Sequence, residues 1–135
     1  MPPKKAAGDA GKGEKTFKSL CAVFHSVGAH GTGPKLGGVF GREPSTQEGF
    51  NYSGSLAGKG KWGEKTLDKY LKSPADYAPG NSMAFAGIPN AKDRADVIAY
   101  LATLKWFFYQ RYKKNFFKIK KLEVFKFMIL KIIIE

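Results

Sequence analysis

The chain has 135 residues and a mass of 14.9 kDa, which is enough for one domain with a modest core. Its 23 Lys and Arg against 11 Asp and Glu give a net charge of +12, which indicates an acidic protein, an anionic membrane surface or nucleic acid as a partner. The single cysteine excludes an internal disulfide, and no zinc-ligand spacing, basic helix with heptads or RNA-recognition signature accompanies the charge, so we expect no nucleic acid.

Residues 1–8 are predicted to be a flexible lead because they include few bulky apolar side chains. The start of the sequence also shows no secretory signal, because it lacks an apolar region and a small-residue cleavage site. A helix is predicted from Asp9, its N-cap, to Val23. Gly13 lies inside this helix, where it costs about 1 kcal/mol relative to alanine. Such a glycine predicts close approach by another backbone element.

The pentad from Cys21 to His25 is similar to a c-type haem attachment site, Cys-x-x-Cys-His, with Phe24 in place of the second cysteine. In the complete motif two thiols bind the haem vinyl groups and the histidine binds iron. Alone, the pentad also fits a small buried cysteine and a hydrogen-bonded core histidine. The rest of the chain has to decide between these interpretations.

Residues 26–60 are dense in glycine, which predicts loops without regular elements. So long a loop region inside a compact domain needs something to hold it, such as a large flat apolar ligand. A short helix over residues 64–72 follows, with Leu67, Tyr70 and Leu71 on one side, and Pro74 ends it. Pro79 and Gly80 then predict a turn before Met83.

The last helix of the body is predicted to begin after Asn90, which can cap it. Val97, Ile98, Leu101 and Leu104 form its apolar face. The predicted fold is therefore all-α, with helices at both ends of the body and glycine-rich loops between them.

Residues 106–135 contain no Gly, Pro, Ala, Ser, Thr or Asp, and residues 105–135 hold nine basic and two acidic side chains. Three interpretations stay open for this extension. It could lie on an anionic membrane surface, with its aromatic residues at the headgroup level. It could be a partner-binding arm, or an unselected sequence read from A- and T-rich DNA. Its longest apolar runs are too short to cross a bilayer.

An ordered set of residues from about 8 to 105 resembles mitochondrial class I cytochrome c. The matching residues are Gly8, Asp9, Gly13, Phe17, Cys21, His25, Gly33, Pro34, Leu36, Phe40, Gly41, Arg42, Gly49, Phe50, Tyr52, Trp62, Thr66, Leu67, Tyr70, Leu71, Pro74, Tyr77, Pro79, Gly80, Met83, Phe85, Gly87, Arg94, Asp96, Ile98, Tyr100 and Leu101. The basic start and the segment 95–105 are similar to cytochromes of euglenozoan protists, which also attach haem through one cysteine. Those proteins keep the second cysteine, whereas this chain keeps the first.

The resemblance implies a class I cytochrome c fold, in which the N- and C-terminal helices cross and the loops wrap one haem c. It implies a single thioether at Cys21 and iron ligands at His25 and Met83. Pro34 would accept a hydrogen bond from the histidine ring and fix its tautomer. A histidine and methionine pair suits a raised reduction potential.

The resemblance also assigns the remaining haem-contacting residues. Arg42, Tyr52 and Trp62 would bind a buried haem propionate, and Asn81 would replace a threonine of the family with a further hydrogen bond to it. Tyr70 would lie beside the methionine, and Phe85 would line the haem pocket.

These assignments predict a cytochrome domain over residues 9–105 and a separate extension over 106–135. The implied function is a monomeric electron carrier, not an enzyme, between the cytochrome bc1 complex and cytochrome c oxidase in the mitochondrial intermembrane space. Two alternatives stay open. One is a degenerate homologue without working haem that serves as an interaction or structural protein, and the other is a weak peroxidase whose iron becomes accessible to peroxide when the methionine leaves it.

The resemblance also predicts weaker electrostatic steering of the protein toward acidic partner surfaces, because non-basic residues occupy positions where the family has docking lysines. These residues are Leu20, Ala75, Asp76 and Ser82.

Overall fold

The computed structural model describes residues 7–104 and residue 118. The chain divides into two units, residues 1–105 and 106–135, and the fold below is that of the first. The predictions for residues 1–6 and for the extension, residue 118 apart, fall outside the described residues. Among the helices in the described part, none is long and apolar enough to cross a membrane.

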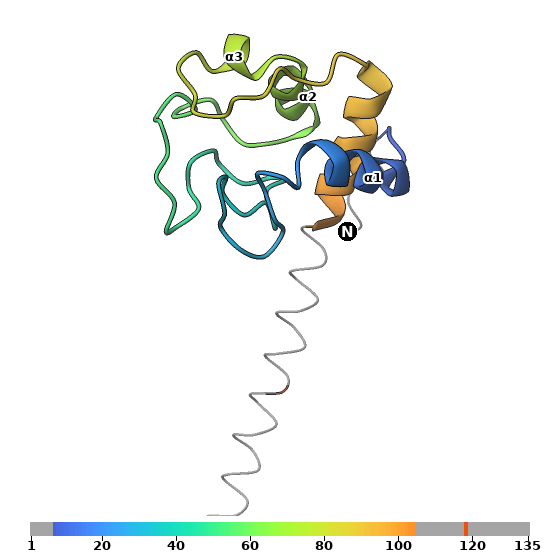
Figure 1. Cartoon of the computed structure of the whole chain (residues 1–135), viewed down its shortest axis with the longest axis horizontal. Helices are drawn as coiled ribbons and strands as arrows, with labels where there is room; N and C mark the ends of the chain where they lie inside the picture. The colour runs from blue at the N-terminus through green and yellow to red at the C-terminus, as the bar shows by residue number, and fades with distance from the viewer. Residues whose placement is uncertain (1–6, 105–117, 119–135) are drawn as a thin grey trace, which may run out of the picture. The chain divides into compact units, whose positions relative to one another are not determined.

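Helix α1 covers Ala10–Leu20, and Asp9 is its N-cap (Figure 1). The Asp9 carboxylate accepts hydrogen bonds from the backbone N–H groups of Gly11 and Lys12, which would otherwise have no partner. The helix ends at Leu20 and not at the predicted Val23. The reason is local, because Cys21 forms the C-cap and residues 21–24 continue as turns.

Helix α2 covers Glu64–Lys72, as predicted, and buries Leu67 and Leu71. A third, short helix, α3, covers Pro74–Tyr77 directly after α2, in a segment where no helix was predicted. Ser73 between them is extended, with φ −154° and ψ 93°. Pro74 therefore ends one helix and occupies the first position of the next, where its missing N–H costs nothing.

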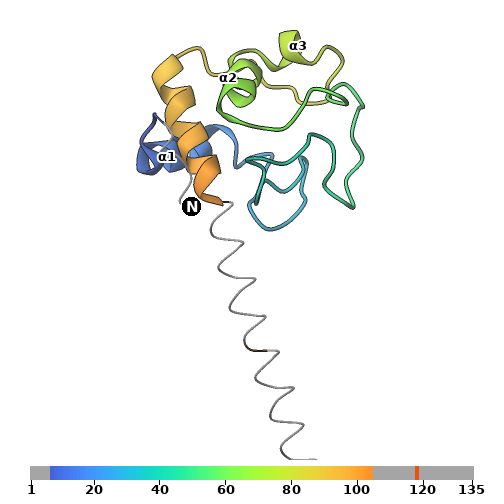
Figure 2. The same ribbon diagram turned by 180° about the vertical axis from the view of Figure 1, so that it is seen from behind.

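The last described helix covers residues 91–104. The Asn90 side-chain oxygen caps it by accepting from the N–H groups of Lys92 and Asp93. Figures 1 and 2 show this helix, in gold to orange, crossing α1. No strand is found in residues 7–104, so the predicted all-α class is confirmed.

The crossing of the two terminal helices explains the glycine inside α1. A Cβ atom at Gly13 would overlap the backbone carbonyl of Asp96. One turn further on, the rings of Phe17 and Tyr100 pack with their centroids 5.2 Å apart. The absence of a side chain at Gly13 thus allows the helix backbones to touch, as the sequence predicted.

Residues 26–63 form loops without helix or strand. Backbone hydrogen bonds join distant parts of these loops: Gly41 N–H donates to the Trp62 carbonyl at 2.6 Å, and Trp62 N–H donates to the Arg42 carbonyl at 2.8 Å. The indole of Trp62 is buried and belongs to the same core as Phe17 and Leu101. The loops therefore pack against the helices and enclose a cavity between them.

Candidate functional site

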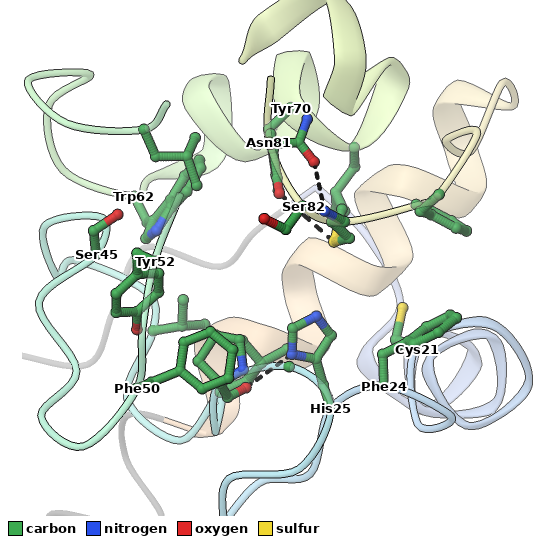
Figure 3. A pocket seen from close by; sticks show the side chains of 18 of the residues that line it. Cys21, Phe24, His25, Ser45, Phe50, Tyr52, Trp62, Tyr70, Asn81 and Ser82 are labelled. Carbon is green, nitrogen blue, oxygen red and sulfur yellow. Dashed lines mark hydrogen bonds between the residues drawn. The ribbon is translucent and has the colours of Figure 1, made fainter. Parts of the chain in front are cut away.

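A cavity of about 480 Å³ lies between the loops and the helices (Figure 3). This volume is within the range of ~300–1,000 Å³ for ligand and cofactor pockets. Its walls are largely apolar and aromatic, and a few polar groups are distributed among them. The lining includes all ten residues that the family resemblance assigns to a haem site: Cys21, His25, Pro34, Arg42, Tyr52, Trp62, Tyr70, Asn81, Met83 and Phe85.

His25 lies on one side of the cavity, and its ring is fixed from behind. The Nδ1 atom is 2.8 Å from the Pro34 carbonyl oxygen, and a Cβ atom at Gly33 would overlap the ring. Since a carbonyl only accepts, Nδ1 carries the proton and Nε2 keeps its lone pair. Burial lowers the pKa of His25 despite the Pro34 hydrogen bond, so the imidazole is neutral at pH 7. A neutral, oriented imidazole with a free Nε2 is suited to binding a metal.

Met83 is held by two residues that Figure 3 draws across the cavity from His25. The Tyr70 hydroxyl is 3.6 Å from the methionine sulfur, and burial raises the pKa of this tyrosine to about 12, so the hydroxyl stays a donor. The Asn81 side-chain oxygen accepts from Met83 N–H at 2.8 Å. The thioether and the imidazole thus line opposite sides of one cavity.

Asn81 differs from its expected role. Its amide nitrogen donates to the carbonyls of Pro74 and Ala78, at 2.9 and 2.8 Å. Both N–H groups are therefore directed to the backbone, and none is left over for a carboxylate. In the structure Asn81 shapes the loop that carries Met83.

Cys21 and Phe24 lie at a third side of the cavity (Figure 3). Burial raises the pKa of the Cys21 thiol to about 11, so the side chain is a neutral thiol at pH 7. The turn that follows α1 brings the two residues together, since Phe24 N–H donates to the Cys21 carbonyl at 3.0 Å. A half-buried phenyl ring therefore occupies the place where a second thiol would face the cavity.

The remaining end of the cavity is rich in hydrogen-bond donors. Arg42 donates through Nη1 to the Gly37 carbonyl at 3.0 Å and to the Gln47 side-chain oxygen at 2.6 Å. Within the described residues, neither the Tyr52 hydroxyl nor the Trp62 indole N–H has a hydrogen-bond acceptor. Burial lowers the pKa of Arg42, yet an arginine stays charged in proteins. Free donors beside a cation suit an anionic group such as a carboxylate.

Two residues at this end have no counterpart among the residues predicted from the sequence. Gln47 orients Arg42, and Ser45 lines the cavity from the same loop. Neither residue belongs to a motif or to a periodic pattern, so the sequence carried no signal for them. The whole wall fits haem c, because it offers a thiol, a neutral imidazole and a thioether on opposite sides, both of which are groups that can bind iron, and donors for the carboxylates.

Comparison with known proteins agrees with this geometry. A model of the cytochrome c family matches residues 10–105. Cytochrome c of Chlamydomonas reinhardtii is 50% identical over 99 residues, which cover 70% of this chain and 88% of the alga's protein. Cytochrome c of Euglena viridis is 46% identical over 101 residues, covering 73% of this chain and 99% of that protein.

Bacterial proteins match as well. Cytochrome c2 of Rhodomicrobium vannielii is 48% identical over 102 residues, covering 73% of this chain and 81% of the bacterial protein. The solved structure of cytochrome cH from Methylobacterium extorquens superposes with a TM-score of 0.67 at 38% identity, covering 71% of this chain and 99% of that one. The chain belongs to the cytochrome c family, whose members hold haem c covalently through cysteine thioether links and are electron carriers, not enzymes.

Proposed function

We propose that this protein carries single electrons between the cytochrome bc1 complex and cytochrome c oxidase in the mitochondrial intermembrane space. The observation that carries the proposal is the placement of a neutral imidazole, His25, and a thioether, Met83, on opposite sides of one cavity. Similarity to cytochromes c of an alga, of cotton and of Euglena supports the mitochondrial location.

In this proposal His25 Nε2 and the Met83 sulfur hold the iron. When bound, haem c supplies a one-electron iron couple. The Pro34 carbonyl keeps the imidazole in the tautomer that leaves Nε2 free, and the Tyr70 hydroxyl orients the sulfur. Because a thioether favours the ferrous state, this ligand pair gives the raised potential that an electron shuttle needs.

Cys21 would form the only covalent link, since it is the single cysteine in the chain. Phe24 and Phe85 would cover the porphyrin with apolar surface, and Arg42, Tyr52 and Trp62 would hold its carboxylates. Burying an ionised carboxylate without such partners would cost roughly several kcal/mol of free energy. The Asn81 amide would act indirectly, through the Met83 loop.

The proposed electron-transfer partners are acidic surfaces, which a chain of net charge +12 attracts. Steering at the expected docking positions is weaker than in the family, because Leu20, Ala75, Asp76 and Ser82 are all exposed and none is basic. We propose that the cytochrome domain covers residues 9–105, acts as a monomer, and is followed by a separate extension whose basic residues favour an anionic membrane.

The proposal is tested on the full chain produced together with a haem-attachment system. We expect a protein whose haem stays with the polypeptide in acid acetone, whereas the Cys21→Ala variant releases it. The remote Ser19→Ala variant, on the exposed face of α1, is the matched control and should keep its haem. A folded wild type that stays colourless would contradict the proposal and favour the degenerate homologue.

The partner assignment needs its own measurement. Reduced protein should be oxidised by cytochrome c oxidase at a rate that falls as salt is added, because screening weakens charge attraction. Rapid reaction with peroxide, but none with the oxidase, would favour the peroxidase alternative. Deleting residues 106–135 should reduce binding to anionic vesicles if the extension contacts membranes.

A further inference from the structure

Ser45 combines two unfavourable features in the loop after Arg42. Its backbone has φ +58°, and it is the only non-glycine residue with a positive φ in the described part of the chain. Its hydroxyl oxygen is buried and has no hydrogen-bond partner, and no other buried side-chain nitrogen or oxygen among the described residues is in this condition. Both features occur at one residue that lines the cavity.

Each feature has a cost that folding alone does not explain. A side chain with a Cβ atom is disfavoured in the left-handed region, where glycine would fit without strain. A buried hydroxyl without a partner loses its hydrogen bonds to water and gains none in return. Strained residues of this kind cluster where a ligand is held. The loop thus places the Ser45 hydroxyl where no group of the described residues forms a hydrogen bond with it.

The surroundings indicate which chemical group the hydroxyl meets. Figure 3 draws Ser45 with Tyr52 and Trp62 at one end of the cavity. The hydroxyl of Tyr52 and the indole N–H of Trp62 are also donors without acceptors in the described residues, but unlike the Ser45 hydroxyl these two atoms are not fully enclosed by protein. The guanidinium of Arg42 lines the same cavity. One acidic side chain, Glu43, also lines the cavity, but it is exposed to solvent. A negatively charged hydrogen-bond acceptor at this end of the cavity would pair with all of these donors.

We propose that Ser45 donates a hydrogen bond from Oγ to a carboxylate of the bound haem, as a positioning residue beside Tyr52 and Trp62. This inference rests on the proposed haem site. The contact satisfies the buried hydroxyl, and it gives the left-handed backbone of Ser45 a function. A hydrogen bond to the ionised form of a carboxylate lowers its pKa, so Ser45 keeps that charge in place as the pH falls.

The test compares the haem-loaded full chain with two variants. Ser45→Ala removes the hydroxyl, and Ser45→Gly removes it while also relieving the positive φ, so that one variant folds even if the other does not. We expect the carboxylate stretching band of isotope-labelled haem propionate to shift in both variants. We also expect the acid limb of the potential-against-pH curve to move up by about one pH unit. Ser19→Ala, whose exposed hydroxyl donates to the Thr16 carbonyl, serves as the control and should change neither.

The outcomes separate this inference from the proposed function. If both Ser45 variants keep the wild-type haem spectrum, propionate band and pH curve, the Ser45 contact does not exist although the haem site does. If the wild type binds no haem, both proposals fail together. A shift shared by the two variants and absent from the control supports the contact, because loss of strain alone occurs only in the glycine variant.

Discussion

The backbone N–H of Asp9 donates a 2.7 Å hydrogen bond to Oδ1 of Asp96, which joins the N-cap of α1 to the last described helix. The Lys92 ammonium lies 3.4 Å from both oxygens of the same carboxylate. Asp96 is buried, so its charge depends on these partners. The two helices at opposite ends of the domain are therefore held together by a titratable group.

This hydrogen bond makes the stability of the domain depend on pH. The Asp9 N–H, followed by Lys92, holds the pKa of Asp96 below its ordinary value of about 3.9. The folded state therefore binds this proton less readily than the unfolded state does. The resulting stabilisation is present above about pH 4 and is lost as the pH falls through the folded pKa.

We expect the Asp96→Asn variant to keep the acceptor for Asp9 but to lose this acid dependence. Denaturant unfolding between pH 3 and 7, approximately, would show a flatter decline of the unfolding free energy on the acid side. Glu48→Gln, at an exposed position where the side chain has no hydrogen bond or ion pair within the described residues, is the matched control and should retain the wild-type slope. An unchanged slope in Asp96→Asn would show that other carboxylates cause the acid sensitivity.

The closeness of the helix crossing gives a second prediction. Alanine at Gly13 would place its Cβ atom on the Asp96 carbonyl, so the helices must move apart. We expect Gly13→Ala to destabilise the domain by about 1–3 kcal/mol, the usual cost of overpacking, in spite of the better helix propensity of alanine. Thermal unfolding would measure the loss.

Gly28→Ala is the control for this change, because a Cβ atom at Gly28 meets nothing within 4 Å. We expect this exposed loop variant to differ from wild type by less than about 1 kcal/mol. Equal stability of the two alanine variants would mean that the crossing adjusts without cost.

Local patterns accounted for much of this fold. Asp9 and Asn90 were recognised as N-caps from residue type and position, and α2 was placed at its observed bounds, because capping and apolar periodicity are local properties. The end of α1 and the short α3 were not predicted. Cys21 ends α1 by capping geometry, and the α3 turn depends on an extended Ser73 that no composition reveals.

The residues of the candidate site likewise fall into those that the sequence predicts and those that only the fold reveals. His25 and Met83 could be assigned through motif spacing and family resemblance, and the structure places both on one cavity. The role of Asn81 could not be read from its position beside the methionine, because its amide finds backbone carbonyls of a turn that only the fold creates. Ser45 and Gln47 come from a loop whose path is set by distant contacts, so only coordinates identify them.

The contact between Tyr70 and Met83 gives a third prediction. Tyr70→Phe removes the hydroxyl 3.6 Å from the sulfur and keeps the packing of the ring against Trp62, whose centroid lies 5.0 Å away. Sulfur that no longer accepts a hydrogen bond donates more electron density, which favours ferric iron. We expect a lower reduction potential, by no more than the equivalent of about 1 kcal/mol.

Tyr77→Phe is the matched control, since the Tyr77 ring packs on Tyr70 at 5.7 Å but does not line the cavity. Voltammetry should place its potential at the wild-type value. A Tyr70→Phe variant with an unchanged potential and an unchanged sulfur-to-iron absorption band would show that the hydroxyl does not act on the sulfur.

The neighbouring positions of Cys21 and Phe24 give the last prediction. Both side chains line the cavity and belong to one turn, so Phe24→Cys would put a second thiol at the same edge of the haem. A thiol S–H adds across a haem vinyl C=C, which forms the C–S bond and removes the vinyl group from conjugation. We expect the pyridine spectrum of Phe24→Cys to shift to shorter wavelength relative to wild type.

The double variant Cys21→Ala, Phe24→Cys shows whether the turn itself favours one attachment position. If the fold presents both positions equally, the introduced thiol keeps the haem on the polypeptide in acid acetone, although Cys21→Ala alone releases it. Phe24→Ala is the control, because it clears the same space without adding a thiol and should leave the pyridine spectrum unchanged. Release of haem from the double variant would mean that the turn directs only Cys21 at a vinyl group, and that Phe24 occupies a position where a thiol would not react.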